Sequence, residues 1–168
     1  FVEGVAVEEL AATHGTPLYI YSRNHMRAQY QRLAEALADY RLVSELYPDV
    51  VQPLNNAGRI LSALGRDEEA ERSYLRALEI DPDNAEAHQQ YAEHLAQIGR
   101  LDEALRSAHR SVALDPTAAI RVFVLAYILE INVRYEESIA AYERAIELDP
   151  ALLRAHFGLI NAQLALGE

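Results

Sequence analysis

The side chains that could do chemistry in this chain are histidines, carboxylates and arginines, because the sequence contains neither cysteine nor lysine. All 15 basic residues are Arg, so a lysine Schiff base is impossible, and disulfides and thiolate metal sites are excluded too. The six histidines show no His-Glu-x-x-His spacing, and no glycine-rich phosphate loop occurs. We therefore expect no catalytic residue, no metal and no cofactor, so the chain should not be an enzyme.

The net charge and the hydropathy of the sequence indicate which classes of binding partner can be expected. The formal net charge of −11 opposes phosphate backbones, which excludes nucleic acid as an expected partner. The longest apolar stretch, 118–129, is interrupted by Arg121 and is too short to cross a bilayer, so no membrane partner is expected. The cytoplasm is the expected location of the protein. Because the first residue is Phe1 rather than Met, the position of the natural N-terminus stays open.

A sequence repeat of fixed length indicates which helices would position these side chains. Prolines recur every 34 residues, at Pro48, Pro82, Pro116 and Pro150, and three of them follow an Asp. Proline cannot continue a helix and disfavours helix in the residue before it, so each phrase should end one helix and set the start of the next. The period predicts a repeat architecture made of helices.

Two further columns keep the same period. The first holds small residues and the second is mostly tyrosine; they are Ala36, Ala70, Ala104 and Ser138, and Tyr40, Tyr74, Ala108 and Tyr142. Their offset of four residues places both on one helical face. Small residues on that face, including Ala77 and Ala145, predict close packing of neighbouring helices. Gly65, Gly99 and Gly167 mark turns, and Asn132 is expected to replace glycine as the left-handed residue of the third turn.

The phrase Gly65-Arg66-Asp67-Glu68-Glu69-Ala70, followed by Tyr74, Ala77 and Pro82, resembles the tetratricopeptide repeat. The resemblance implies an all-α fold, a right-handed superhelix of antiparallel helix pairs. It divides residues 33–168 into a partial unit 33–50, full units 51–84, 85–118 and 119–152, and a partial unit 153–168. Helices are expected close to 52–64, 67–81, 86–98, 101–115, 120–132, 135–149 and 154–166.

Residues 1–32 break the pattern and form a separate extension. The sequence predicts a short helix from Val7 to Ala12 and a short strand from Leu18 to Tyr21. Together with Gly15-Thr16-Pro17, these segments resemble the start of diaminopimelate decarboxylases, which use pyridoxal phosphate. The cofactor lysine of that family has no counterpart here, so the alternative to a scaffold is a non-functional remnant of such an enzyme fused to the array, as a natural or engineered chimera.

The junction between the extension and the array predicts one continuous helix. Ser22 is a suitable N-cap, Pro48 ends the segment, and no helix-breaking residue lies between Arg23 and Tyr47. Gln31-Arg32 stands where a repeat would carry its turn glycine. We therefore expect an unbroken helix from about Arg23 to about Leu46.

The resemblance further implies that the first helix of each pair lines a concave surface, where a peptide or protein partner would bind. Outward positions there include Gln97 and Arg154, and the candidate peptide-binding residues are Asn55, Arg59, Gln89, Glu93, Ile120, Phe123, Tyr127, Ile131, Phe157 and Asn161. The family's chaperone-binding members hold a peptide carboxylate with paired Lys and Asn residues. This chain has no lysine, and Glu86 and Glu93 would oppose a carboxylate.

The helix expected over 120–131 is apolar on almost every side, so something should cover its outward face. Three covers are possible: the N-terminal segment of this chain, a second copy, or a foreign apolar peptide. The last expected helix lacks a following partner, which leaves Leu159, Leu164 and Leu166 incompletely covered. A homo-oligomer could therefore form through residues 120–131 or through the C-terminal end.

Overall fold

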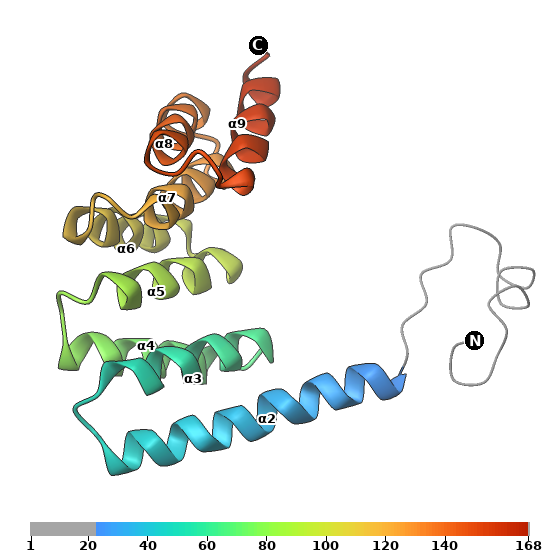
Figure 1. Ribbon diagram of the computed structural model, residues 1–168, viewed down its shortest axis with the longest axis vertical. Coiled ribbons are helices and arrows are strands. Elements are labelled where there is room, and N and C mark those ends of the chain that lie inside the picture. The colour runs from blue at the N-terminus through green and yellow to red at the C-terminus, as the bar shows by residue number, and fades with distance from the viewer. Residues whose placement is uncertain (1–22, 168) are drawn as a thin grey trace, which may run out of the picture.

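The computed structural model describes residues 23–167, which fold entirely into helices with no strand (Figure 1). The short helix, the strand and the Ser22 cap expected within 1–22 lie outside the described residues. The helices are α2 (Arg23–Leu46), α3 (Val51–Ala63), α4 (Asp67–Ile80), α5 (Ala85–Gln97), α6 (Leu101–Leu114), α7 (Ala119–Ile131), α8 (Tyr135–Leu148) and α9 (Leu153–Leu166). The bounds of α3 to α9 agree with the expected ones to about one residue, and the all-α class is confirmed.

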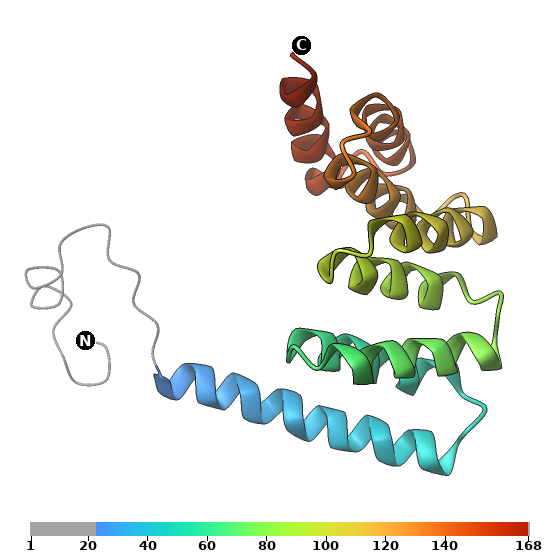
Figure 2. The ribbon, with the colours of Figure 1, turned by 180° about the vertical axis from the view of Figure 1, so that it is seen from behind.

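Helix α2 confirms the continuous helix expected at the junction. It runs through Gln31 without a turn and ends at Leu46, two residues before Pro48. Leu37 in its second half is buried against α3, whereas Met26 and Tyr30 in its first half are exposed. Figures 1 and 2 show this first half projecting beyond the stack, at the end opposite to α9.

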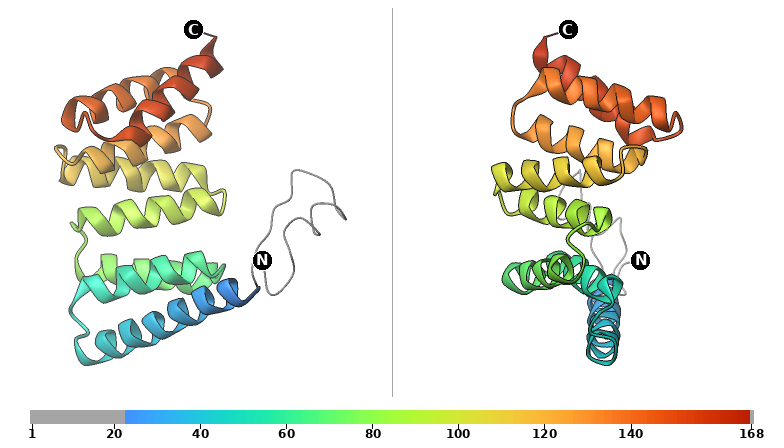
Figure 3. Two further views of the ribbon diagram at one scale, coloured as in Figure 1. Left: turned by 45° about the vertical axis from the view of Figure 1, so that its right-hand side comes forward. Right: turned by 90° about the vertical axis from the view of Figure 1, so that its left-hand side faces the viewer.

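The helices stack in sequence order, as the two views of Figure 3 show. Each helix from α3 to α8 packs against the one before and the one after it. The odd-numbered helices α3, α5, α7 and α9 also contact one another in a row, whereas the even-numbered helices do not. A row whose members touch forms the inner side of a curved stack, so the odd-numbered helices line the concave face.

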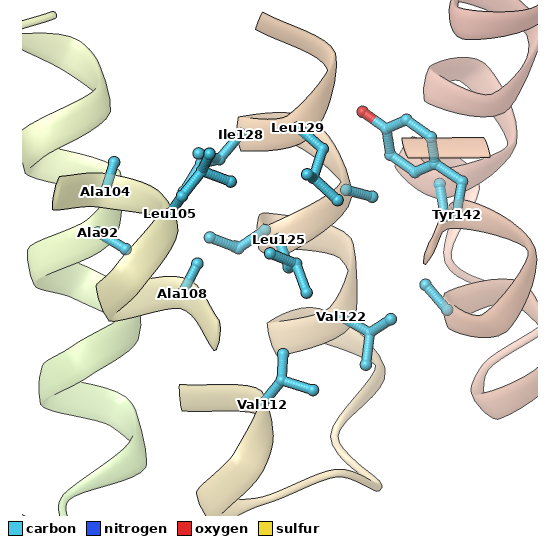
Figure 4. Close-up of a cluster of buried hydrophobic side chains, with 14 of the residues drawn as sticks. Ala92, Ala104, Leu105, Ala108, Val112, Val122, Leu125, Ile128, Leu129 and Tyr142 are labelled. Atoms are coloured by element: carbon cyan, nitrogen blue, oxygen red, sulfur yellow. The ribbon is translucent and has the colours of Figure 1, made fainter. Parts of the chain in front are cut away.

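The core lies between successive helices and depends on small side chains. Ala70, Ala77, Ala104 and Ala145 are fully buried, as the column of small residues predicts. Around α7, the side chains of Val122, Leu125 and Leu129 fill the space between α6 and α8 (Figure 4). The small residues therefore let the helix backbones approach closely, and the aliphatic residues fill what remains.

Two glycines allow tyrosine rings to lie flat against a neighbouring helix. A Cβ atom added at Gly58 would lie 2.8 Å from the ring of Tyr74, and one added at Gly158 would overlap the ring of Tyr142. Both tyrosines are at most 2% exposed. At these two positions the absence of a side chain is what makes room for the ring.

The turns confirm two expectations and correct a third. Gly65 and Gly99 adopt left-handed backbone conformations, with φ of +68° and +80°. In the third turn, however, the left-handed residue is Val133, with φ of +61°, and Asn132 has φ of −90°. The 34-residue register places Val133 where the other turns have glycine, and this register outweighs the local preference of asparagine.

Val133→Gly is therefore expected to raise the free energy of unfolding by about 1 kcal/mol, because a branched residue is strained in the left-handed region. Val133 is 68% exposed, so little apolar burial is lost. Urea denaturation would measure the gain. Val133→Ala is the control, since alanine also disfavours this conformation; equal gains for both variants would contradict the explanation.

Candidate functional site

A groove of about 300 Å³ lies on the concave face, where α5, α7 and α9 adjoin. Four of the candidate binding residues meet there: Glu93, Ile120, Phe123 and Tyr127. Arg154 closes the groove from α9, as its outward position predicted. The remaining lining residues are Ala96, Gln97 and Val124. We call this space the apolar groove.

The floor of the apolar groove comes from α7. Phe123 is partly buried, and its ring centroid lies 6.0 Å from that of Tyr142. The guanidinium of Arg154 lies over the same ring, 5.3 Å from its centroid. Such a cation–π contact holds the long arginine side chain over the aromatic floor. Tyr127 is 47% exposed and offers an aromatic surface that no helix of the described chain covers completely.

A smaller space of about 140 Å³ adjoins the apolar groove between α3 and α5. Glu93 and Gln97 line both spaces, so the two are immediate neighbours. The other lining residues are mostly polar: Arg59, Ser62, Ala63, Tyr74, Gln90 and His94. We call this second space the polar pocket.

Two buried polar atoms on the lining residues of the polar pocket lack a hydrogen-bond partner among residues 23–167. They are Oε1 of Gln90 and Nε2 of His94. Nδ1 of His94 lies 3.1 Å from the hydroxyl oxygen of Ser62, and burial lowers the pKa of the imidazole. Buried polar atoms are almost always paired in folded proteins, by protein groups or by ordered water. Both atoms are buried, so a molecule in the pocket reaches neither of them without a shift of the surrounding side chains.

Carboxylates border the site, and their described hydrogen-bond partners are amides rather than cations. Gln89 Nε2 donates to Glu93 Oε1 over 2.9 Å. Gln90 Nε2 donates to Glu86 Oε1, also over 2.9 Å. Amide donors orient a carboxylate without neutralising it. The charges of Glu86 and Glu93 therefore remain available to a ligand.

Asn55 corrects one expectation. It was expected to face outward, but it is fully buried, and neither of its side-chain polar atoms has a hydrogen-bond partner within the described chain. The structure thus places this position in the interior of the stack rather than on its surface. Asn55 therefore cannot contact a partner in this conformation.

The other candidate residues lie around the site rather than in it. Arg59 lines the polar pocket, and Gln89 holds Glu93. Ile131 is partly buried outside both spaces, and Phe157 and Asn161 are exposed on α9. Sequence reasoning missed Gln90, His94, Ala96 and Val124. Gln90 and Val124 occupy equivalent positions of two repeats, 34 residues apart, and each directly follows a candidate residue, Gln89 or Phe123. A prediction that included the next residue along each helix would have found them.

Two histidines have structural roles. Nε2 of His88 lies 2.9 Å from the carbonyl oxygen of Pro82, and Nε2 of His156 lies 3.0 Å from that of Pro150. Residues 23–167 contain no cluster of His, Asp or Glu able to hold a metal ion. Over the same range, no helix combines the length and the apolar character that crossing a bilayer requires.

Comparison with known proteins agrees with this geometry. The model of the TPR repeat family matches residues 58–93 and 134–167. MamA from Desulfovibrio magneticus RS-1 is 23% identical, with a TM-score of 0.70 over 84% of this chain and 83% of that one. The first TPR of Spaghetti (RPAP3), solved bound to an HSP90 peptide, is 22% identical, with a TM-score of 0.66 over 70% of this chain and 94% of that one. Residues 58–93 and 134–167 thus match tetratricopeptide repeats, and the fold of the described residues is that of a tetratricopeptide array.

Short stretches also match diaminopimelate decarboxylases. The Pseudomonas aeruginosa enzyme is 55% identical over 38 residues, which are 23% of this chain and 9% of that enzyme. The Aquifex aeolicus enzyme is 37% identical over 62 residues, which are 34% of this chain and 15% of that enzyme. The chain thus spans only a small fraction of the length of these relatives.

Proposed function

We propose that this chain is an interaction scaffold that holds a peptide segment of a partner across its concave face. The observation that carries the proposal is the apolar groove, with the half-exposed Tyr127 at its floor and the 67% exposed Phe157 beyond it. Aromatic residues dominate the binding energy of many interfaces when a partner covers them. Exposure of these two rings to water does not stabilise a monomer.

The arrangement of the site favours an extended segment over a compact ligand. Apart from Tyr74 of α4, the residues that line the apolar groove and the polar pocket come from α3, α5, α7 and α9. A segment crossing these helices would contact one after another, placing successive side chains in the two spaces. The peptide-bound RPAP3 domain, similar in fold, supports this mode of binding for the class, and the identity of a partner does not transfer from it.

A second candidate is self-association, because α9 exposes an apolar stripe. Leu153, Phe157, Ile160 and Leu164 are between 52% and 69% exposed and follow one another at intervals of four, three and four residues. That spacing places them along one side of α9. A second copy could cover this stripe, and it could also cover Tyr127.

The third candidate, a decarboxylase remnant fused to the array, is supported by the short matches alone. Its chemistry would need an aldimine between pyridoxal phosphate and a lysine, and the chain has no lysine. We propose that any segment inherited from such an enzyme acts here without that cofactor.

Tyr127→Ala is expected to weaken peptide binding at least tenfold, because it removes an exposed ring from the groove floor while sparing the core. Peptides would be selected from a random display library against the whole chain, and their affinities measured by fluorescence anisotropy. Leu75→Ala is the matched control, since Leu75 is 43% exposed on α4, outside the concave row.

Two outcomes would overturn the scaffold proposal. Selected peptides that bind Tyr127→Ala as well as the parent chain would place binding elsewhere. Sedimentation of the parent chain as a dimer, with Tyr127→Ala as a monomer, would show that a second copy occupies the groove.

A further inference from the structure

We infer that the concave site takes a basic–apolar segment: an apolar side chain enters the apolar groove, and a neighbouring Lys or Arg places its charged head in the polar pocket beside Glu93. This inference rests on the proposed function and specifies the chemistry of the partner. It is carried by the placement of the charged residues Glu93, Arg59 and Arg154 around the two neighbouring spaces.

The apolar half of the segment follows from the floor of the groove. Phe123, Tyr127 and Ile120 supply aromatic and aliphatic surface, and Ala96 and Val124 add small apolar walls. A space of about 300 Å³ accommodates one large side chain with adjoining backbone. Arg154 already lies over the ring of Phe123, so the α9 side of the groove carries a cation that would repel a second one. The basic residue must therefore lie on the α5 side.

The basic half follows from the carboxylate on that side. Glu93 lines both spaces, and its described partner is the neutral amide of Gln89. An ammonium or guanidinium group carries several donors and a positive charge, and it could pair with the carboxylate of Glu93. A ligand carboxylate placed beside Glu93 would be repelled by its negative charge.

Three other titratable groups line the pocket, and burial raises the pKa of the first, the phenol of Tyr74, so it adds no charge. Burial lowers the pKa of His94, which disfavours the charged imidazolium. Arg59 is exposed at the α3 edge of the pocket and opposes a cation there. The net charge of −11 attracts cationic segments at long range. The preference for a cationic residue should therefore depend on whether its attraction to Glu93 exceeds its repulsion from Arg59.

Because Glu93 and Arg59 carry opposite charges, neutralising each of them should change the preference for Lys in opposite directions. Short labelled peptides with one Leu and one variable residue, separated by one to four positions, would be compared by fluorescence anisotropy with the whole chain. We expect Lys peptides to bind at least fivefold more tightly than the matching Gln peptides, and Glu peptides to bind most weakly. Glu93→Gln should remove the preference for Lys, whereas Arg59→Gln should increase it. Added salt should reduce it in both the parent chain and Arg59→Gln.

Glu143→Gln is the control for net charge, because Glu143 is exposed on α8, away from the concave row, and should leave the preference unchanged. Equal binding of Lys, Gln and Glu peptides that still depends on Tyr127 would overturn this inference and leave the scaffold proposal standing. Binding that depends on neither Tyr127 nor Glu93 would overturn both. An equal loss of preference in Glu143→Gln and Glu93→Gln would show a general effect of charge and would also overturn it.

Discussion

Replacing Tyr142 with alanine is expected to lower the free energy of unfolding by about 3–5 kcal/mol. The side chain is 1% exposed and lies between α7, α8 and α9, with its ring against Phe123 and over Gly158. Its removal leaves a cavity that neighbouring helices cannot fill without shifting. Urea denaturation followed by circular dichroism would measure the loss.

Tyr142→Phe separates the ring from its hydroxyl. The hydroxyl donates to Glu130 Oε2 over 2.6 Å, so this variant should lose about 1 kcal/mol and keep the packing. A loss in Tyr142→Phe as large as that in Tyr142→Ala would show that the hydrogen bond, rather than the ring, holds α7 and α8 together.

Ala104→Leu is expected to destabilise the stack by about 1–3 kcal/mol through overpacking. Ala104 is fully buried in the core cluster between α5, α6 and α7, and its small side chain belongs to the column that recurs every 34 residues. Three additional carbon atoms would force α6 away from its neighbours. The change in melting temperature, together with the urea midpoint, would record the effect.

Ala113→Leu is the matched control, because Ala113 lies on the same helix and is exposed. The two substitutions change helix propensity and hydrophobicity equally, so only their packing differs. Similar melting temperatures for both variants would mean that the column of small residues does not mark the close contact.

The sequence predicts the helices of this fold well because its strongest signals are local. Pro48, Pro82, Pro116 and Pro150 fix the helix ends, and the absence of any breaker before Pro48 predicts the whole of α2. Burial of Ala70 and Ala104 follows from the repeated small side chain. Each of these features depends on a residue and its neighbours along one helix, which a single sequence contains.

The candidate site is less predictable because it depends on how helices meet. Asn55 was placed outward by its column, yet it is fully buried in the stack. Helical periodicity identified the stripe of Ile120, Phe123 and Tyr127, but it could not show that Glu93 would border both the groove and the pocket. Placing the two spaces next to each other requires the spacing of α3, α5 and α7, which no single helix encodes.

The contacts of this fold are confined to helices one or two places apart along the chain. Contact order is therefore low, and little loop-closure entropy opposes the formation of any pair. A chain leaving the ribosome can complete α3 and α4 while α5 is still being made, and each later helix adds to a surface that already exists. The same one-dimensional connectivity lets an inserted or deleted helix pair change the length of the array without rebuilding a central core.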